Sequence, residues 1–229
     1  MAKLSFPIII VNFKTYPESQ GKRGLELSKA AERVARENGV CIAVAPQCVD
    51  IRLIAEAVDI PVFAQHLDPE APGAQTGHLT SEAAKEAGAT GSLLNHSEMR
   101  LRADIIEGAI RRAKGLGLAT CVCANTPSMG AAVSAFSPTM VAVEPPELIG
   151  SGVSVSKAKP EIVRNSVLSI KKIDAGVRVL CGAGVTSGGD VAVAIKLGSE
   201  GILVASGVVK AKDPSAVLND FAKSIWPKK

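Results

Sequence analysis

Short apolar runs and longer amphipathic stretches alternate along the chain. The first run, Ile8 to Val11, is β-branched throughout, which is typical of a strand buried on both faces of a parallel sheet. In the stretch after it, apolar residues recur every three or four positions from Leu27 to Ala35, which predicts a helix that ends at Gly39. The same strand-then-helix unit recurs to the end of the sequence.

Eight such units fit into the chain. The predicted strands cover residues 8–11, 40–44, 61–64, 91–95, 118–123, 139–143, 178–181 and 201–204. The predicted helices lie at 27–35, 47–57, 80–87, 105–113, 127–133, 160–170, 186–197 and 214–225. About 28 residues for each unit suits one (β/α)₈ barrel domain over residues 1–229, and is short for a doubly wound sheet plus a second domain.

Polar residues with chemical potential follow several predicted strands. Asn12 and Lys14 follow the first strand, His96 the fourth and Glu144 the sixth. Barrel sites are built from the loops after the strand C-termini, so these side chains are expected to converge. The structural alternatives are a surface lysine and a hydrogen-bonded core histidine. If the histidine is functional, a short helical turn capped by Ser97 would favour a neutral imidazole.

The segment after Glu144 has the composition of a lid. Pro145 and Pro146 prevent the strand from continuing, since they remove two backbone donors. Residues 148–154 are small and glycine-rich with an apolar tip, which suits a segment that closes over a ligand. An ordinary acidic residue before an ordinary loop is the alternative interpretation.

Two glycine-rich turns follow the seventh and eighth predicted strands, at residues 182–184 and 205–207. Each is expected to leave backbone N–H groups bare at a helix N-terminus. Such groups bind phosphate dianions, and phosphate sites of barrels lie after strands seven and eight. The two turns together predict a phosphate site.

Composition excludes several classes of protein. A net charge of +4 with dispersed Lys and Arg, and an aromatic content of 3%, argue against nucleic-acid binding. The first apolar run is too short for a signal peptide or a membrane span. Five cysteines without a CxxC pair indicate reduced core residues of a cytoplasmic protein. Cys121 and Cys123 share a strand face without further ligands nearby, so no metal site is predicted.

Five motifs together resemble the triosephosphate isomerase family, in its shorter archaeal-type form, over the whole chain. They are Asn12-Phe13-Lys14, Asn95-His96-Ser97-Glu98, Val143-Glu144-Pro145-Pro146 with Ile149-Gly150-Ser151-Gly152, Cys181-Gly182-Ala183-Gly184-Val185, and Leu203-Val204-Ala205-Ser206. More familiar members have Pro-x-Trp after the glutamate, Tyr-Gly-Gly-Ser after the seventh strand and paired glycines after the eighth. The chain departs from the family pattern at all three places.

The resemblance implies interconversion of dihydroxyacetone phosphate and D-glyceraldehyde 3-phosphate through an enediolate, in glycolysis and gluconeogenesis, without cofactor or metal. It implies that Glu144 is the base, His96 the neutral electrophile and Lys14 an electrostatic stabiliser, with Asn12 and Glu98 in supporting roles. Segment 145–155 would close over the phosphate. The residues implied to bind substrate or phosphate are Asn12, Phe13, Lys14, Ile149, Gly150, Gly182, Ala183, Gly184, Ala205 and Ser206.

Loop 65–79 resembles the family's third loop, whose tip, here 73–77, inserts beside the first-strand residues of a neighbouring subunit. This implies a homo-oligomer, a tetramer rather than a dimer in the short branch. Without the resemblance the loop is a surface excursion, although a loop of this length without a helix is usually functional.

Two other functions remain open at this stage. A Schiff-base aldolase would use Lys14 as its nucleophile, since barrels host such lysines and bind the same phosphates. A non-catalytic phosphate-binding protein would keep the fold and lose the chemistry.

Overall fold

The computed structural model describes residues 3–145 and 159–226 of the 229-residue chain. The expected lid over 145–155, with Ile149 and Gly150, therefore lies outside the described residues apart from Pro145.

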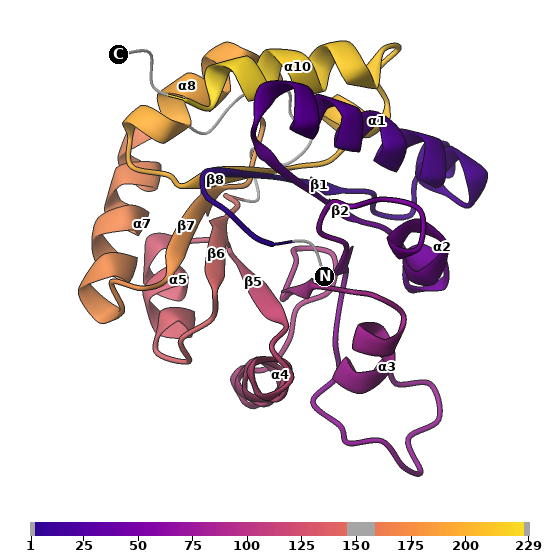
Figure 1. Ribbon diagram of the computed structural model, residues 1–229. Helices are drawn as coiled ribbons and strands as arrows, with labels where there is room; N and C mark the ends of the chain where they lie inside the picture. Colours follow the sequence, from indigo (N-terminus) through magenta and orange to yellow (C-terminus); the bar gives the residue numbers. More distant parts are fainter. Residues whose placement is uncertain (1–2, 146–158, 227–229) are drawn as a thin grey trace.

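The described strands form one parallel sheet that closes into a barrel (Figure 1). The strands are β1 (Ile8–Asn12), β2 (Cys41–Ala45), β3 (Phe63–Ala64), β4 (Gly91–Leu94), β5 (Ala119–Ala124), β6 (Met140–Val143), β7 (Arg178–Cys181) and β8 (Gly201–Val204). Neighbours follow the order β2-β1-β8-β7-β6-β5-β4-β3, and a parallel bridge between Val44 and Val62 joins the two ends of that order. The predicted (β/α)₈ barrel is confirmed.

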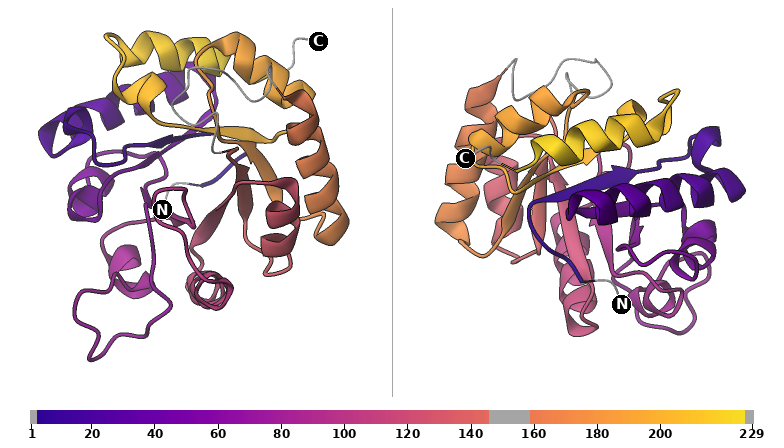
Figure 2. Two further views of the ribbon diagram at one scale, coloured as in Figure 1. Left: turned by 180° about the vertical axis from the view of Figure 1, so that it is seen from behind. Right: turned by 45° about the horizontal axis from the view of Figure 1, so that its top comes forward.

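The helices lie outside the strands, as the three views together show (Figures 1 and 2). They are η1 (Pro17–Ser19), α1 (Lys22–Asn38), η2 (Cys48–Asp50), α2 (Ile51–Ala55), α3 (Ser81–Glu86), α4 (Ala103–Gly115), α5 (Pro127–Ser134), α7 (Pro160–Ile173), α8 (Gly188–Lys196), α9 (Ser206–Val209) and α10 (Pro214–Ser224). The first and last α-helices, α1 and α10, pack side by side, as the pairing of β1 with β8 requires.

Alternate residues of each strand face two different apolar layers. In β1, Ile8 and Ile10 belong to the layer inside the barrel, whereas Ile9 and Val11 belong to the layer between strands and helices. All four side chains are at most 1% exposed. Each such burial contributes about 1.5–3 kcal/mol, so the barrel is a rigid frame for its loops.

Glycine and proline residues at the helix ends explain where several helices begin and end. Gly39 adopts φ 63° after α1 and donates its N–H to the carbonyl of Ala35, as expected of a glycine stop. Pro127, Pro160 and Pro214 occupy the first turns of α5, α7 and α10. Among the described helices, none combines the length and apolar content that crossing a membrane requires.

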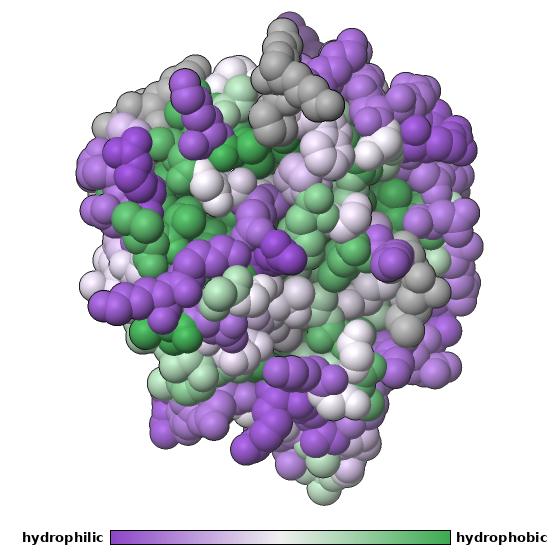
Figure 3. Space-filling model, turned by 60° about the vertical axis from the view of Figure 1, so that its left-hand side comes forward, coloured by the Kyte–Doolittle hydropathy of each residue, from purple (hydrophilic) through white to green (hydrophobic). Residues whose placement is uncertain are grey.

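The outer surface is mixed in character. On the face shown in Figure 3, apolar patches lie between predominantly hydrophilic side chains. Loop 65–79 leaves the barrel after β3 as a long excursion before α3, as predicted (Figure 1).

Candidate active site

A cleft of about 230 Å³ lies where the strands end. Loops after β1, β4, β6, β7 and β8 all contribute to it, as the barrel prediction requires. The lining residues are Asn12, Lys14, Tyr16, His96, Glu144, Gly182, Ala183, Gly184, Val185, Thr186, Leu203, Val204, Ala205, Ser206 and Gly207. The cleft therefore brings together most of the described residues that the sequence nominates.

Glu144 directly follows β6 and is only 2% exposed. Its backbone N–H donates to the carbonyl of Ala124 at 2.8 Å, which continues the ladder with β5 and fixes where the side chain emerges. Oε2 is buried and has no hydrogen-bond partner. Burial raises the pKa of Glu144 to about 7, although the Cys123 thiol and the Lys14 ammonium oppose the rise. Such a carboxylate accepts a proton near neutral pH.

Because Gly182 has no side chain, it leaves space for the Glu144 carboxylate. A Cβ at position 182 would lie 2.6 Å from Cγ of Glu144 and 3.3 Å from its Oε1. Carbon atoms do not approach so closely, so any side chain here would displace the acid. Gly182 lines the cleft as predicted, and its contact with Glu144 is a role that the sequence did not reveal.

His96 faces Glu144 from the end of β4. Its Nε2 lies 3.6 Å from Oε1 of Glu144, and its Nδ1 accepts a hydrogen bond from the Glu98 N–H at 3.2 Å. An Nδ1 that accepts leaves the proton of the neutral ring on Nε2, so this tautomer is assigned from the hydrogen bond. Burial lowers the pKa of His96 to about 4, and Lys14 adds to the effect. The imidazole is therefore neutral at physiological pH.

The turn after His96 differs in detail from the prediction. It is a single turn closed by the N–H of Met99 on the carbonyl of His96 at 2.8 Å, and Ser97 does not cap a helix there. The amide that holds the ring is that of Glu98. The expected neutral imidazole is obtained through one backbone hydrogen bond together with burial.

Lys14 sits in an unusual backbone conformation, with φ 47°. The Asn12 carboxamide stabilises it, since Oδ1 accepts the Lys14 N–H at 2.9 Å. The Gln65 side chain donates to the carbonyls of Lys14 at 2.8 Å and Ala45 at 2.9 Å. Outside the cleft lining, Glu98 holds the Lys14 ammonium, with Oε1 2.6 Å from Nζ.

Phe13 does not reach the cleft, which corrects its predicted contact with substrate. Its side chain is 0% exposed and packs in the core, and its N–H donates to the carbonyl of Ala45 at 3.0 Å. Neither group is free for a ligand, because the strand alternation turns Phe13 toward the helices while Asn12 and Lys14 face the cleft.

The expectation of bare amides at α8 is also wrong. Asp190 accepts the N–H groups of Thr186 at 3.0 Å and Ser187 at 2.9 Å through Oδ2. Asp220 on α10 accepts the N–H of Gly188 at 2.6 Å. Two carboxylates thus already cap this helix and repel a further anion at its N-terminus.

The amides available to an anion lie instead in the turns after β7 and β8. α9 has no side-chain cap. Within the described part of the chain, no hydrogen bond uses the N–H groups of Gly184, Ser206 or Gly207. All three residues line the cleft, so bare backbone donors are present where a phosphate group would enter.

Sequence reasoning missed three supporting residues. Tyr16 lines the cleft, with the Lys210 ammonium 4.3 Å from its ring centroid. Arg100 donates to the carbonyl of Asn95 at 2.9 Å and so braces the turn that carries His96. Gln65 was noted only as a loop boundary. No local pattern marks these residues, because each acts through partners distant in sequence or through a side-chain direction that only the fold sets.

The chain is similar to characterised proteins of one family. A family model described as triosephosphate isomerase matches residues 7–224. Triosephosphate isomerase of Methanocaldococcus jannaschii is 52% identical over 218 residues, which cover 95% of this chain and 100% of that protein. The enzymes of Methanothermus fervidus and Metallosphaera sedula are 52% and 51% identical, and cover 94% and 95% of this chain and 97% and 95% of their own lengths. The chain belongs to the triosephosphate isomerase family.

Proposed function

We propose that this protein interconverts dihydroxyacetone phosphate and D-glyceraldehyde 3-phosphate through an enediolate, in glycolysis and gluconeogenesis. The observation that carries the proposal is the buried Glu144 carboxylate, 3.6 Å from Nε2 of a neutral histidine. Unused backbone donors in the same cleft provide for the phosphate group. Membership of the family supports the choice of substrate.

Glu144 would remove the proton from the carbon next to the carbonyl. Its raised pKa of about 7 makes the carboxylate a stronger base than an exposed glutamate, and equally makes the carboxylic acid ready to return the proton to the neighbouring carbon.

His96 and Lys14 would stabilise the enediolate oxygens. The neutral ring donates from Nε2, which faces Glu144 and hence the reacting carbons. The Lys14 ammonium supplies the positive charge, and its ion pair with Glu98 holds it in place. Because these groups are ordered before substrate arrives, they stabilise developing charge without reorganisation.

The phosphate would lie against the amides of Gly184, Ser206 and Gly207, with Gly182, Ala183 and Ala205 around it. Segment 145–155, with Ile149 and Gly150, would close over it, although this part of the proposal rests on the sequence alone. A closed, dry cleft would prevent the enediolate from losing phosphate.

The proposed assembly is a cytoplasmic homo-oligomer, a tetramer rather than a dimer, with loop 65–79 at a subunit interface. Residues 71–78 of the single chain are exposed. Beside Lys14 and Glu98, a groove of about 500 Å³ is open in the single chain. A loop tip of a second copy would fill that groove and enclose the catalytic lysine.

The direct test is an isomerase assay of the purified protein with D-glyceraldehyde 3-phosphate, with His96→Gln assayed beside it. The variant should lose about 10²-fold or more in kcat, the scale of a lost acid or electrophile. Inactive but folded wild-type protein, or a fully active variant, would refute the proposal.

Borohydride trapping separates the isomerase from the aldolase alternative. An aldolase would form a covalent adduct between substrate and Lys14, which reduction makes permanent. The ion pair with Glu98 at 2.6 Å argues against this chemistry, because an ammonium held by a carboxylate is a poor nucleophile. The expected result is that no protein carries covalently bound substrate after reduction.

A further inference from the structure

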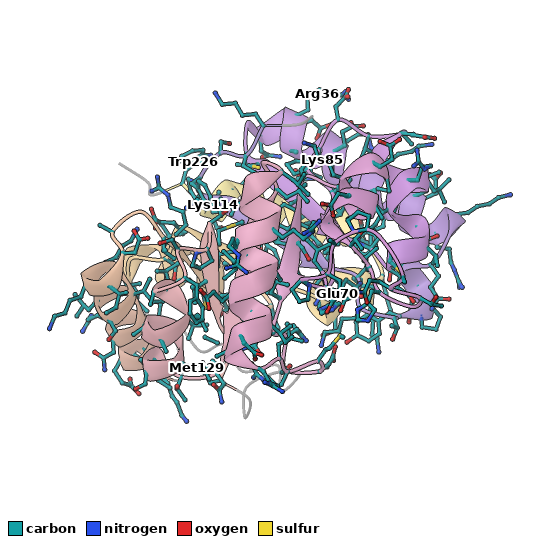
Figure 4. All side chains as sticks on the ribbon, turned by 90° about the horizontal axis from the view of Figure 1, so that it is seen from below. Arg36, Glu70, Lys85, Lys114, Met129 and Trp226 are labelled. Atoms are coloured by element: carbon teal, nitrogen blue, oxygen red, sulfur yellow. The ribbon has the colours of Figure 1, made fainter. Side chains whose placement is uncertain are left out.

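Loop 65–79 contains a cluster of side chains that the proposed reaction does not use. Asp68 and Glu70 lie on its outgoing arm, His78 on its returning arm, and Glu70 is labelled in Figure 4. One potential ligand atom from each residue lies within 4.8 Å of the other two. The cluster therefore joins the two arms at the neck of the loop.

The two distances that His78 makes to the carboxylates match the edge of a metal tetrahedron. Nδ1 of His78 lies 3.4 Å from Oδ1 of Asp68 and 3.3 Å from Oε2 of Glu70. Two ligand atoms that are each about 2.0–2.1 Å from a tetrahedral ion are about 3.3 Å apart. The same distances are long for hydrogen bonds between charged partners, which are about 2.7–2.9 Å.

A second observation points to a cation at this place. Oε2 of Glu70 is buried from solvent and has no hydrogen-bond partner, although the side chain as a whole is 26% exposed. A buried carboxylate oxygen without a donor is costly. A metal ion between Glu70 and His78 would satisfy this oxygen.

Asp68 is already oriented as a metal ligand would be. His66 Nε2 lies 3.0 Å from its Oδ1, and the Leu79 N–H donates to its Oδ2 at 2.7 Å. Hydrogen bonds that fix a ligating carboxylate are typical of metal sites.

We propose that Asp68 Oδ1, Glu70 Oε2 and His78 Nδ1 bind a divalent cation of the Zn²⁺, Co²⁺ and Ni²⁺ class, with His66 as the residue that orients Asp68. An imidazole nitrogen with two carboxylate oxygens suits these ions better than Mg²⁺ or Ca²⁺, which prefer oxygen ligands alone. In the single chain the three side chains are 20%, 26% and 38% exposed, so an ion has a path of entry before a second copy covers the groove.

Binding would lock the neck of the loop. The chain already pairs there through the Asp68 N–H and the carbonyl of Leu79 at 2.9 Å, and an ion would add ligands from both arms. Gln65, which holds the carbonyl of Lys14, lies immediately before the neck. The site would thus restrain loop 65–79 while standing outside the catalytic cleft.

The test is titration of untagged, chelator-treated full-length protein with Co²⁺, read by its visible absorption and then by displacement with Zn²⁺. A stoichiometric site gives ligand-field bands that Zn²⁺ abolishes. His78→Asn and Glu70→Gln should each lose the bands, and His66→Gln should weaken affinity by about 10–100-fold. Zn²⁺ should raise the Tm of the wild type and leave that of His78→Asn unchanged.

Two control variants make the result specific. Glu107→Gln removes an exposed carboxylate outside the cluster, and Cys48→Ser removes the exposed thiol that lines the groove beside His66. Both should bind Co²⁺ as the wild type does. Absence of bands in the wild type, bands that persist in folded His78→Asn and Glu70→Gln, or bands lost in Cys48→Ser would overturn the site.

Discussion

Glu144 and His96 show how one physical effect prepares two residues for different tasks. Burial disfavours the charged form of each, so it raises the pKa of Glu144 to about 7 and lowers that of His96 to about 4. Near neutral pH, the glutamate therefore exchanges protons while the imidazole stays neutral. Burial thus prepares Glu144 as a base and His96 as an uncharged hydrogen-bond donor.

The pH dependence of kcat/KM follows from these values. Only ionised Glu144 is a base, so kcat/KM should fall by about tenfold for each pH unit below about 7. His96 remains neutral until about pH 4 and should not shape this limb. The phosphate of the substrate titrates near pH 6. D-Glyceraldehyde, which lacks phosphate, therefore serves as the control substrate, and a flat profile from pH 8 to about 5 with it would contradict the assignment.

Gly182 offers a test of how closely the base must be placed. Gly182→Ala adds a methyl group 2.6 Å from Cγ of Glu144 and should push the carboxylate off its position. Displacement of a catalytic group by about 1 Å costs about 10² in rate, so we expect that loss in kcat. Gly115→Ala adds the same methyl group in open space on α4 and should retain full activity. Equal activity of the two variants would show that Glu144 does not need the space.

At the scale of elements, the loop after β1 holds Lys14 under backbone strain. A non-glycine residue at φ 47° costs about 1 kcal/mol or more, and Asn12 and Gln65 offset this with three hydrogen bonds to the backbone. This backbone conformation directs the Lys14 side chain into the cleft. Gln65 comes from the loop after β3, so the ends of β1 and β3, which flank β2, together position one side chain.

Replacement of Gln65 should show how far the position of Lys14 depends on this side chain. Gln65→Leu leaves the carbonyls of Lys14 and Ala45 without their side-chain donor, and should cost about 1–3 kcal/mol in free energy of unfolding, together with about tenfold in kcat/KM. Gln20→Leu removes a single exposed hydrogen bond to the carbonyl of Thr15 in the same loop and should change little. Urea unfolding and steady-state kinetics of the pair measure both effects; indistinguishable variants would contradict the account.

The elements themselves were predictable because their signals are local. Short apolar runs, three-to-four periodicity and Gly39 together located all eight units. The short helix α9 was missed, since four residues carry too little periodicity to detect. The capping of α8 was misjudged because the local capping box of Ser187 and Asp190 was overlooked, and because its other partner, Asp220, lies 32 residues from Gly188.

The candidate active site was also predictable in part from the sequence. Positions after strands placed Lys14, His96 and Glu144 in one cleft, because strand C-termini meet at one end of a barrel. The error at Phe13 arose from carrying a whole motif into the site when its middle residue faces the other layer. The contact of Gly182 with Glu144 required three-dimensional packing.

At the scale of the whole molecule, the proposed homo-oligomer places the exposed tip of loop 65–79 in the groove beside Lys14 of a second copy. We expect the wild type to sediment as a tetramer. Thr76→Asp places a charge on the exposed tip and should yield smaller species with lower activity, because burial of an unpaired charge is costly.

Asn165→Asp is the matched control for this experiment. It adds the same charge to an exposed position on α7, and should leave the sedimentation coefficient unchanged. Analytical ultracentrifugation of the three proteins decides the matter. A monomeric wild type, or a Thr76→Asp variant of unchanged size and activity, would remove loop 65–79 from the proposed interface.

The central claim is that Glu144 transfers a proton through an enediolate, and the most direct measurement is conversion of dihydroxyacetone phosphate in D₂O, followed by NMR. The wild type should form D-glyceraldehyde 3-phosphate that carries solvent deuterium at the carbon next to the carbonyl. Glu144→Gln should lose about 10²–10⁴-fold or more of both turnover and deuterium uptake while remaining folded. Isomerisation without deuterium uptake, or uptake that persists in Glu144→Gln at the wild-type rate, would contradict the claim.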